Sequence, residues 1–318
     1  MEIKYSISYY LRNIKQNAFL SLSPLPKTPS VLTKFLYNLK ILFFTLKFLI
    51  RHKQGKLDIP KIEFMLTNVC NLKCKYCSNY TSAFKENLNY EYEDFKSDLD
   101  TLLKETDSIS ELVLTGGEPF LVYDLDKFIE FAASQQKIKK IKIETNGTII
   151  PNSKIIDILK QFRKKIVLDI SDYSQSPNLD ASILKIEQIK SLCDENKINY
   201  IHKKDEKWFI TQNYKKNYRS ENDLKNIYSL CLPTNISCFD GKISQCPKAT
   251  SFNLLGLCSF SQEQGIDLRS ENLSKQKIID WYTNIIKFDT CDFCNHVDYE
   301  QRRKRINAGE QIEESLYW

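Results

Sequence analysis

The sequence contains few histidines, few glycines and no long uninterrupted apolar segment. Three histidines, scattered over 318 residues, are too few for a metal site built on imidazole rings. The most apolar stretch, residues 36–50, is interrupted by Lys40 and Lys47, so it lacks the roughly 18 consecutive apolar residues of a membrane span. It also lies too deep in the chain for a signal peptide, and no small-residue cleavage site follows it. Apolar residues make up 42% of the chain, which excludes a disordered protein and predicts a sizeable core.

The charge of the chain is unevenly distributed. Residues 1–56 hold ten Lys or Arg and one Glu, so they carry +9, while the whole chain carries +6 and the remainder is therefore at −3. A basic segment of this kind favours an anionic partner, which could be a lipid surface, a phosphate-bearing substrate or a nucleic acid. Nothing else in the sequence resembles a nucleic-acid-binding module, so lipid ranks first and no nucleic acid is expected.

Residues 31–51 have the spacing of an amphipathic helix. Two interpretations remain open: the helix packs its apolar side on the body of the protein, or it lies in a membrane interface. We therefore expect a cytoplasmic protein with a candidate peripheral contact at the inner membrane face through residues 31–51. At 100° per residue, the polar side collects Thr33, Lys40, Lys47 and Arg51, and the apolar side Leu32, Phe35, Leu39, Leu42, Leu46, Leu49 and Ile50.

The ten cysteines form an early trio and a late group. A gap of more than 100 residues separates the trio from the first of the later cysteines, Cys193. Because no signal peptide is expected, the spacings indicate metal ligands or reactive thiols rather than disulfides. The trio lies in TNVCNLKCKYCS (67–78), and a structural metal site normally takes four ligands. The trio therefore either borrows a distant fourth ligand or leaves one metal position open for chemistry. The cysteines are Cys70, Cys74, Cys77, Cys193, Cys231, Cys238, Cys246, Cys258, Cys291 and Cys294.

Strand-like and helix-like patterns alternate from residue 61 to residue 203, which predicts parallel βα units in a barrel or an open sheet. The polar residues that look functional follow the strands, at the edge where such barrels place their active sites. The expected strands are 61–67, 111–119, 140–147, 165–173 and 198–203, and the expected helices are 92–105, 125–136, 154–162 and 182–196.

Two of these strand ends resemble the radical S-adenosylmethionine (SAM) superfamily. The first is C-x3-C-x2-C with Tyr76 before the last cysteine, and the second is TGGEP (115–119). The resemblance implies that Cys70, Cys74 and Cys77 hold a 4Fe–4S cluster whose open iron is chelated by SAM. Reductive cleavage of SAM would then give a 5′-deoxyadenosyl radical that abstracts hydrogen from a substrate. A zinc site with a distant fourth ligand is the alternative interpretation of the trio.

The same resemblance implies contacts to SAM. Gly116 and Gly117 match the turn that lets backbone approach the methionyl part, and glycine is rare in this chain, with eight in all. Glu118 occupies the motif position whose acidic residue meets the amino group of SAM, and Tyr76 is expected to flank the adenine. Two further candidates are Asn146 in ETNGT and Ser171 in DISDY, for which local backbone bonding is the alternative.

The late cysteines resemble the auxiliary-cluster domains called SPASM and twitch. Cys231-x9-Gly241-x4-Cys246 with FDGK as a hairpin turn, followed by CDFC (291–294), is similar to the reduced, twitch-like form. The resemblance implies one auxiliary 4Fe–4S cluster on Cys246, Cys291 and Cys294, with Cys231 favoured over Cys238 as the fourth ligand; a zinc ribbon is the alternative.

These patterns together predict a partial (β/α)6 TIM-type barrel in three parts. They are a basic helical extension at 1–57, the radical SAM barrel at 58–225 and a small twitch/SPASM-like β-hairpin domain at 226–318. The layout is similar to a twitch-type aminocyclitol dehydrogenase, and with AGEQ (308–311) it also resembles uncharacterised radical SAM proteins found among polysaccharide and sugar-nucleotide genes.

The resemblance therefore implies an oxidoreductase or epimerase acting on a sugar-like substrate, which could be phosphate- or lipid-linked. An electron donor such as flavodoxin or ferredoxin is the expected partner. In an epimerase, Cys258 or Cys238 would donate hydrogen to the substrate radical, while Cys193 lies on an expected helix and is expected to be a core residue. The alternatives are a peptide-modifying maturase and a non-catalytic, metal-stabilised binding protein.

Overall fold

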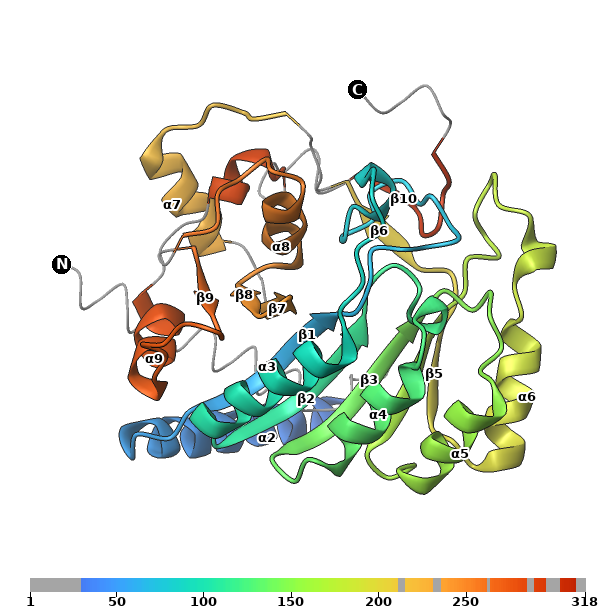
Figure 1. Cartoon of the computed structure of the whole chain (residues 1–318), viewed down its shortest axis with the longest axis horizontal. Coiled ribbons are helices and arrows are strands. Elements are labelled where there is room, and N and C mark those ends of the chain that lie inside the picture. The colour runs from blue at the N-terminus through green and yellow to red at the C-terminus, as the bar shows by residue number, and fades with distance from the viewer. Residues whose placement is uncertain are drawn as a thin grey trace.

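A computed structural model describes most of the chain as one α/β body (Figure 1). The described residues are 30–210, 215–230, 236–261, 264–284, 289–295 and 304–312. A mostly parallel sheet runs through the body, and helices cover one of its faces. This arrangement confirms the predicted fold class, a partial barrel of the TIM type.

The central sheet has eight strands in the order β5-β4-β3-β2-β1-β7-β8-β9. The neighbours from β5 to β7 pair in parallel, and the last two pairings are antiparallel. Because parallel strands need a crossover, each of the strands β1 to β4 is followed along the chain by a helix, as the alternating sequence pattern predicted. The strands are β1 (Asp58–Met65), β2 (Ser108–Thr115), β3 (Ile138–Thr145), β4 (Ile166–Ser171), β5 (Tyr200–Lys203), β7 (Ile236–Phe239), β8 (Lys242–Ser244) and β9 (Gly265–Asp267).

The crossover helices form because apolar residues recur at helical spacing and face the sheet. In α3, Phe95, Leu99, Leu102 and Leu103 are buried, and burying each such side chain contributes about 1.5–3 kcal/mol. The substitution Leu99→Ala should therefore cost about 2–5 kcal/mol of stability. The crossover helices are α3 (Tyr92–Glu105), α4 (Leu125–Ser134), α5 (Ser153–Gln161) and α6 (Ile186–Asn196), with short 3-10 turns η1 (Thr81–Ala83), η2 (Pro119–Leu121) and η3 (Ala181–Ile183).

The predicted FDGK hairpin is confirmed as the turn between β7 and β8. Asp240 and Gly241 both have positive φ, at 47° and 73°, as a tight hairpin turn requires. Its first strand, β7, pairs with β1, so the sheet crosses the division expected between residues 225 and 226. The remaining elements are α7 (Glu221–Leu230), α8 (Pro247–Leu254), α9 (Lys275–Asn284), η4 (Asp289–Phe293) and a separate antiparallel pair, β6 (Lys207–Phe209) with β10 (Arg305–Asn307).

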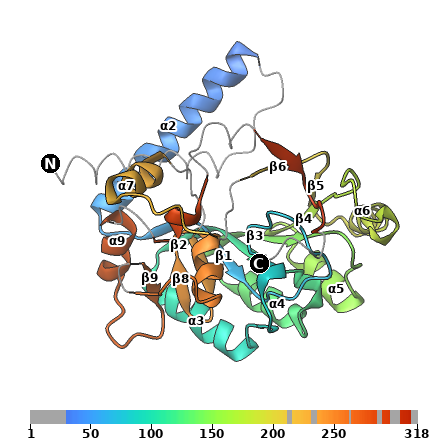
Figure 2. The same cartoon turned by 90° about the horizontal axis from the view of Figure 1, so that it is seen from above.

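The N-terminal helix α2 (Val31–Lys53) extends away from the body, as Figure 2 shows. The interpretation in which its apolar side packs on the protein is wrong, because that side is 45–65% exposed at Leu32, Phe35, Leu39, Leu42, Leu46 and Ile50. No helix among the described residues is long and apolar enough to cross a membrane.

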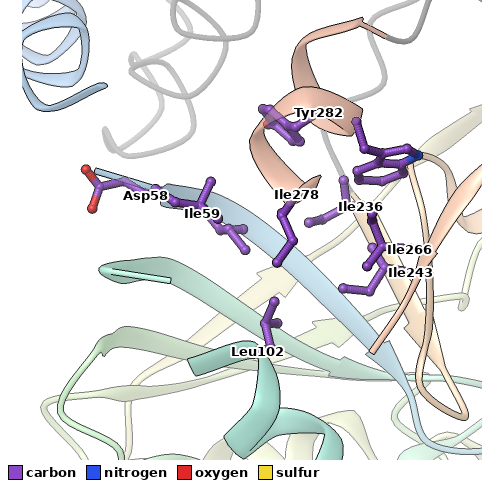
Figure 3. A pocket seen from close by; sticks show the side chains of 10 residues that line it. Asp58, Ile59, Leu102, Ile236, Ile243, Ile266, Ile278 and Tyr282 are labelled. Carbon is purple, nitrogen blue, oxygen red and sulfur yellow. The ribbon is translucent and has the colours of Figure 1, made fainter. Parts of the chain in front are cut away.

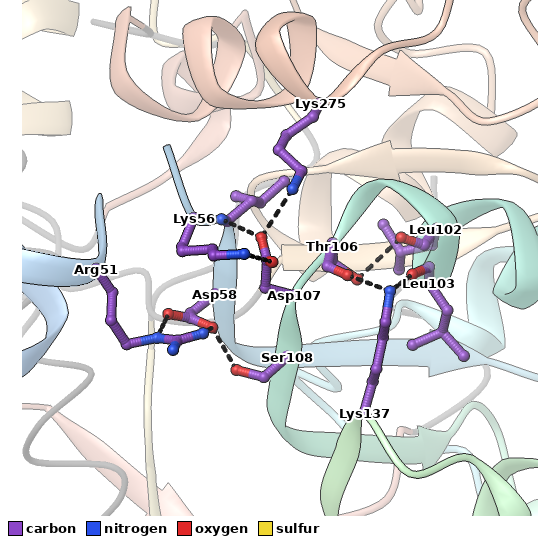
Figure 4. A network of polar contacts seen from close by, with 11 residues as sticks. Arg51, Lys56, Asp58, Leu102, Leu103, Thr106, Asp107, Ser108, Lys137 and Lys275 are labelled. Atoms are coloured by element: carbon purple, nitrogen blue, oxygen red, sulfur yellow. Dashed lines mark hydrogen bonds and ion pairs between the residues drawn. The ribbon is translucent and has the colours of Figure 1, made fainter. Parts of the chain in front are cut away.

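Ion pairs close the amino ends of the strands (Figure 4). Asp58 at the start of β1 accepts hydrogen bonds from Arg51 of α2 at 2.8 Å and from Ser108 of β2. Asp107, just before β2, pairs with Lys56 at 3.0 Å and with Lys275 of α9 at 2.9 Å. This end of the sheet therefore ties α2 and α9 to the first two strands.

The C-terminal elements pack on the barrel through apolar side chains. A small cavity of about 10 Å³ remains at this junction, between α3, β1, the hairpin and α9 (Figure 3). Its volume is close to that of a single water-sized probe, and its lining is almost entirely apolar, so it is a packing gap rather than a ligand site. The lining includes Leu102, Ile236, Ile243, Ile266, Ile278 and Trp281.

Candidate functional site

A large cavity of about 830 Å³ lies at the carboxyl ends of the barrel strands. Cysteines from both groups line it: Cys70, Cys74 and Cys77 from the loop after β1, and Cys246 and Cys294 from the C-terminal part. The two groups are far apart in the sequence and meet because β7 pairs with β1 in one sheet. The predicted gathering of polar residues at this edge is thus confirmed for the cysteine trio.

The Gly116–Gly117 pair packs against the loop that leads to the trio. Gly117 N–H donates to the Thr67 carbonyl at 2.7 Å, and Glu118 N–H donates to the Val69 carbonyl at 2.9 Å. A Cβ atom at Gly117 would lie 1.9 Å from the Val69 carbonyl oxygen, which no side chain can accept. Glycine is therefore needed because two backbones run side by side, and both glycines also line the cavity.

The trio thiols accept hydrogen bonds from neighbouring donors. Cys70 Sγ accepts from the backbone N–H of Leu72 at 3.4 Å and from Asn146 Nδ2 at 3.7 Å. Cys74 Sγ accepts from Gln311 Nε2 at 3.4 Å. Burial raises the pKa of the Cys70 thiol to about 12, and it also raises the pKa of Cys74. Without a metal these thiols are therefore protonated at neutral pH, and ligation would release their protons.

The donor set of the trio fits an iron–sulfur cluster, whose ligands are cysteine thiolates. A cluster binds each thiolate through a different iron, so its ligands surround a volume rather than meet at a point. Three thiols lining one cavity beside a glycine cradle match that requirement.

The Glu118 carboxylate is buried and bonded within the protein, and its contact with the amino group of SAM stays a prediction. Its two oxygens accept hydrogen bonds from the backbone N–H groups of Asn146 at 2.7 Å and Phe120 at 3.1 Å, and from Thr145 Oγ1 at 2.9 Å. Burial raises the pKa of Glu118 to about 7 even though these donors act to lower it. The side chain thus joins the loop after β2 to the end of β3.

The other predicted cofactor contacts all line the cavity. Tyr76 has a φ of 59°, an uncommon backbone conformation for a bulky residue and one that recurs at functional sites. Asn146 donates to Asn71 Oδ1 at 2.9 Å, and its own Oδ1 accepts from the Thr148 backbone at 3.0 Å, so part of its bonding is local. Ser171 lies at the end of β4. Their roles toward SAM stay predictions.

The late cysteines take different positions. Cys246 at the start of α8 and Cys294 after η4 line the cavity, and Lys248 Nζ lies 3.7 Å from Cys294 Sγ. Cys291 lies in η4 and is partly buried against the main core. Cys231 lies outside the described residues. Their shared ligation of an auxiliary cluster stays a prediction.

The two candidate hydrogen-donor thiols do not line the cavity. Cys238 is fully buried on β7, where its sulfur lies 3.9 Å from the Tyr90 hydroxyl, and burial raises its pKa. Cys258 packs against a small cluster that contains Tyr80 and Phe252. Cys193 is fully buried in the main core, as expected from its place on a helix.

Sequence reasoning missed several residues that complete the cavity wall. They converge from β3, the loop after β4, β5, the turn before β6, β6 itself and the start of α8, and short strands such as β6 carry no periodic signal. The Tyr173 ring meets the Trp208 ring edge to face at 5.7 Å, and burial raises the pKa of Tyr173 well above its ordinary value. The missed residues include Glu144, Tyr173, Lys203, Glu206, Lys207, Trp208, Phe209 and Lys248.

A row of ion pairs crosses the parallel strands and ends at the cavity. Burial raises the pKa of Glu63 to about 7 in spite of its neighbour Lys61. At the other end Lys203 pairs with the fully buried Asp169 at 2.8 Å, and Lys203 also lines the cavity. Charged groups thus stand where barrel interiors usually place branched apolar side chains. The other pairs are Lys61–Glu63 at 3.4 Å, Lys61–Glu111 at 3.9 Å, Lys142–Glu111 at 3.5 Å and Lys142–Asp169 at 3.5 Å.

Comparison with known proteins finds one matching family model and several curated relatives. The family model described as "Radical SAM superfamily" matches residues 64–194. A GTP 3′,8-cyclase of Synechocystis is 35% identical over 96 residues, covering 29% of this chain and 28% of the relative. The subtilosin biosynthesis protein AlbA of Bacillus subtilis is 32% identical over 109 residues, covering 34% and 23%. The chain thus spans about a quarter of the length of these relatives.

Two solved structures are similar at low identity. BtrN in complex with AdoMet and 2-DOIA is 16% identical with a TM-score of 0.42, covering 80% of this chain and 96% of that one. Native anSMEcpe with bound AdoMet is 15% identical with a TM-score of 0.47, covering 71% and 82%.

Proposed function

From a chain that carries a radical SAM domain, we propose an enzyme that cleaves SAM reductively and removes hydrogen from a polar, sugar-like substrate. One observation carries the proposal: cysteines of the early trio and of the late group line the same cavity. A substrate bound there would lie between the group that starts the reaction and a group that can accept an electron.

The radical SAM superfamily uses SAM and a 4Fe–4S cluster, which together supply a carbon-centred radical when they are bound and reduced. In this chain Cys70, Cys74 and Cys77 would hold the cluster. Gly116 and Gly117 leave backbone exposed to the cavity, where SAM would bind close to the main chain. Their packing on the trio loop and the buried Glu118 would keep these parts in register.

The lining of the cavity supports a polar, ring-shaped and anionic substrate. Trp208 and Phe209 offer flat apolar faces, while Lys203, Lys207 and Lys248 offer positive charge. Aromatic rings bind the apolar face of a sugar-like ring, and ammonium groups bind phosphate as point charges. A phosphate- or nucleotide-linked sugar satisfies both features.

The reaction proposed is a two-electron oxidation of a C–H bond. In this reaction Glu144 would take up the proton that the substrate releases, while bound SAM would supply the hydrogen-atom acceptor and an auxiliary cluster the one-electron acceptor. Glu144 lines the cavity, and the thiols of Cys246 and Cys294 open onto it. Oxidation is favoured over epimerisation because neither Cys238 nor Cys258 lines the cavity and could return a hydrogen atom. In this proposal Cys291 and Cys231 complete the auxiliary ligand set.

The proposal is tested on anaerobically purified protein. Iron and sulfide are quantified, and the protein is then reduced with dithionite in the presence of SAM. Formation of 5′-deoxyadenosine is the expected result. Its absence from a protein with intact clusters would leave a metal-stabilised binding protein as the better account.

Oxidation and epimerisation are separated by two thiol substitutions. Cys258→Ala and Cys238→Ala should leave both SAM cleavage and substrate turnover unchanged. If either variant still cleaves SAM but forms no product, the thiol is a hydrogen donor and the reaction is an epimerisation.

Peptide modification is the second candidate, and the match to AlbA favours it. Its distinguishing sign would be a substrate-dependent rise in 5′-deoxyadenosine with a peptide rather than with a sugar phosphate. Parallel assays with a nucleotide-sugar set and with peptides encoded beside the gene decide between the two.

We also propose that α2 contacts an anionic membrane surface and that flavodoxin or ferredoxin supplies the electrons. The helix exposes Phe35, Leu39 and Leu42 and contains basic but no acidic residues, a composition that suits an anionic interface. Sedimentation with phosphatidylglycerol vesicles should deplete the protein from solution, and phosphatidylcholine vesicles should not. Equal recovery with both vesicles would leave a protein partner as the occupant of this helix.

A further inference from the structure

The segment Ala308–Gln311, the AGEQ of the sequence, lies against the cysteine loop rather than in a separate domain. Lys75 N–H donates to the Glu310 carbonyl at 2.6 Å, and Ile312 N–H donates to the Lys73 carbonyl at 2.8 Å. These bonds flank Cys74, which bridges to Gln311. A segment more than 230 residues away thus pairs with the trio loop through an isolated β-bridge.

The Gln311 side chain is fixed at both ends of its amide. Its Oε1 accepts from the Lys73 backbone N–H at 2.7 Å. This bond requires an acceptor, so the amide nitrogen must point the other way, toward the Gly309 carbonyl at 2.5 Å and Cys74 Sγ at 3.4 Å. The N–H that reaches the sulfur is therefore set by the bonding pattern rather than by an arbitrary amide orientation.

The body of the protein holds this segment from the other side. Asn178 donates to the Gln311 carbonyl at 2.9 Å and accepts from the Gln311 N–H at 2.8 Å. Ser176 donates to the Gly309 carbonyl at 2.9 Å. Gly309 has a φ of 76°, and a Cβ atom there would lie 2.4 Å from the Tyr173 ring, so the chain must turn closely over that ring.

We propose that Gln311 is a positioning residue for the SAM-binding cluster, acting on it through Cys74. An N–H that bonds a ligating sulfur stabilises the electron-rich, reduced cluster and so raises its reduction potential. The same bond holds the Cys74 side chain in place within a loop that must present three thiols together. This role rests on the proposed function, since it requires a cluster on the trio.

The sharp test is Gln311→Glu in the full-length reconstituted protein. Glutamate keeps an oxygen for the Lys73 N–H but replaces the donor to sulfur by a negatively charged oxygen. The matched control is Glu310→Gln, which lies on the same segment and contacts Lys75 at 3.2 Å but no thiol. The cluster whose electron paramagnetic resonance signal changes on adding SAM is titrated against redox mediators.

At a fixed solution potential, Gln311→Glu should lower the ratio of reduced to oxidised cluster at least threefold. This corresponds to a fall of about 28 mV in the reduction potential of a one-electron couple. Glu310→Gln should leave that ratio unchanged. An unchanged ratio in Gln311→Glu overturns the role of Gln311 while the proposed function stands. A wild-type cluster that does not respond to SAM overturns both.

A second measurement uses the iron-free protein. Iodoacetamide alkylation, mapped by mass spectrometry, should be several-fold faster at Cys74 in Gln311→Met than in the wild type, with Cys70 unchanged. Equal acceleration at all three thiols would mean general loosening of the loop and would overturn the specific role. If Gln311→Glu and Gln311→Met keep the wild-type circular dichroism spectrum but lose iron while Glu310→Gln retains it, the positioning role is supported.

Discussion

The two ends of the barrel sheet are built from different interactions. At the amino ends, exposed and half-buried charges such as Arg51, Lys56 and Lys275 pair with Asp58 and Asp107 and join helices to strands. At the carboxyl ends, thiols, close backbone contacts and a buried carboxylate surround an open cavity. The interactions at the amino ends stabilise the folded protein. The buried polar groups at the carboxyl ends lower its stability unless each is hydrogen-bonded. Substitutions at the two ends should therefore separate stability from chemistry.

The largest effect is expected at the trio. Cys70→Ala should reduce 5′-deoxyadenosine formation by more than about 100-fold. Losing a residue that only supports a metal ligand already costs up to about 100-fold, and Cys70 is expected to be a ligand itself. The thermal midpoint of the iron-free protein should change little, because Cys70 lies in a loop. Cys193→Ala is the matched control: it lies in the core and should retain the cluster. Normal cluster content in Cys70→Ala would contradict the ligand assignment.

The second largest effect is expected for Gly117→Ala. A Cβ atom there would meet the Val69 carbonyl at 1.9 Å and force the trio loop to move. A displacement of about 1 Å at a reacting site costs about 100-fold in rate, and SAM affinity measured by equilibrium dialysis should fall with it. Gly55→Ala is the control at the opposite end of the sheet. Gly55 has a φ of 70° with open space around it, so its substitution should cost only about 1 kcal/mol and leave SAM binding intact.

Glu144→Gln tests the proton acceptor. Loss of a general base costs about 100-fold in product formation. SAM cleavage should continue, so the ratio of 5′-deoxyadenosine to product should rise. The control is Glu111→Gln, because Glu111 pairs with Lys142 and does not line the cavity; it should keep that ratio near the wild-type value. A parallel fall of cleavage and product in Glu144→Gln would indicate a role in SAM binding instead.

The smallest effect on chemistry is expected at the amino end. Asp107→Asn should lower the free energy of unfolding by about 2 kcal/mol, because charged hydrogen bonds from Lys56 and Lys275 are weakened, without changing cluster content. Burial acts to raise the pKa of Asp107, but the Lys275, Leu57 N–H and Lys56 bonds outweigh it and lower that pKa.

The pH dependence of the stability difference between wild type and Asp107→Asn follows from the lowered pKa of Asp107. A lowered pKa in the folded state means that the stabilisation is present above the ordinary value of 3.8 and is lost as the pH falls below it. Urea unfolding from pH 7 to pH 3 should therefore show the stability difference between wild type and Asp107→Asn constant at neutral pH and beginning to narrow below about 3.8. Asp124→Asn, which removes an exposed pair with Lys127, should show a difference near zero throughout.

The parts of the fold that follow from the sequence are those with a local period. The helix 92–105 was predicted with the bounds observed, and the strands from β1 to β5 were located to within four residues at each end, because apolar spacing marks each element. β6 and β10 have three residues each and pair across about 100 positions, so no local sequence pattern predicts them. The hairpin was predicted from FDGK, but its parallel pairing with β1 depends on long-range packing.

The candidate site shows the same limit. Cysteine spacing identified the trio because ligand spacing is local. The orientation of Glu118 could not be predicted, since the sequence shows an acid after two glycines but not whether it faces the cavity or the Asn146 backbone. Tyr173 and Trp208 converge from different elements. Tyr173 is the last residue of the DISDY motif, but the sequence does not show that it meets Trp208. AGEQ was noticed as a motif, yet its contact with Cys74 required the structure.

The pairing of β7 with β1 has a consequence for electron transfer. β1 leads directly into the loop of Cys70, and the β7–β8 hairpin leads directly into Cys246, so both cysteine regions are attached to one hydrogen-bonded sheet. Under the proposed function, strand spacing and register, rather than a flexible linker, would set the tunnelling distance between the two clusters. Insertions in the surface loops would leave that distance, and hence the rate of the electron step, unchanged.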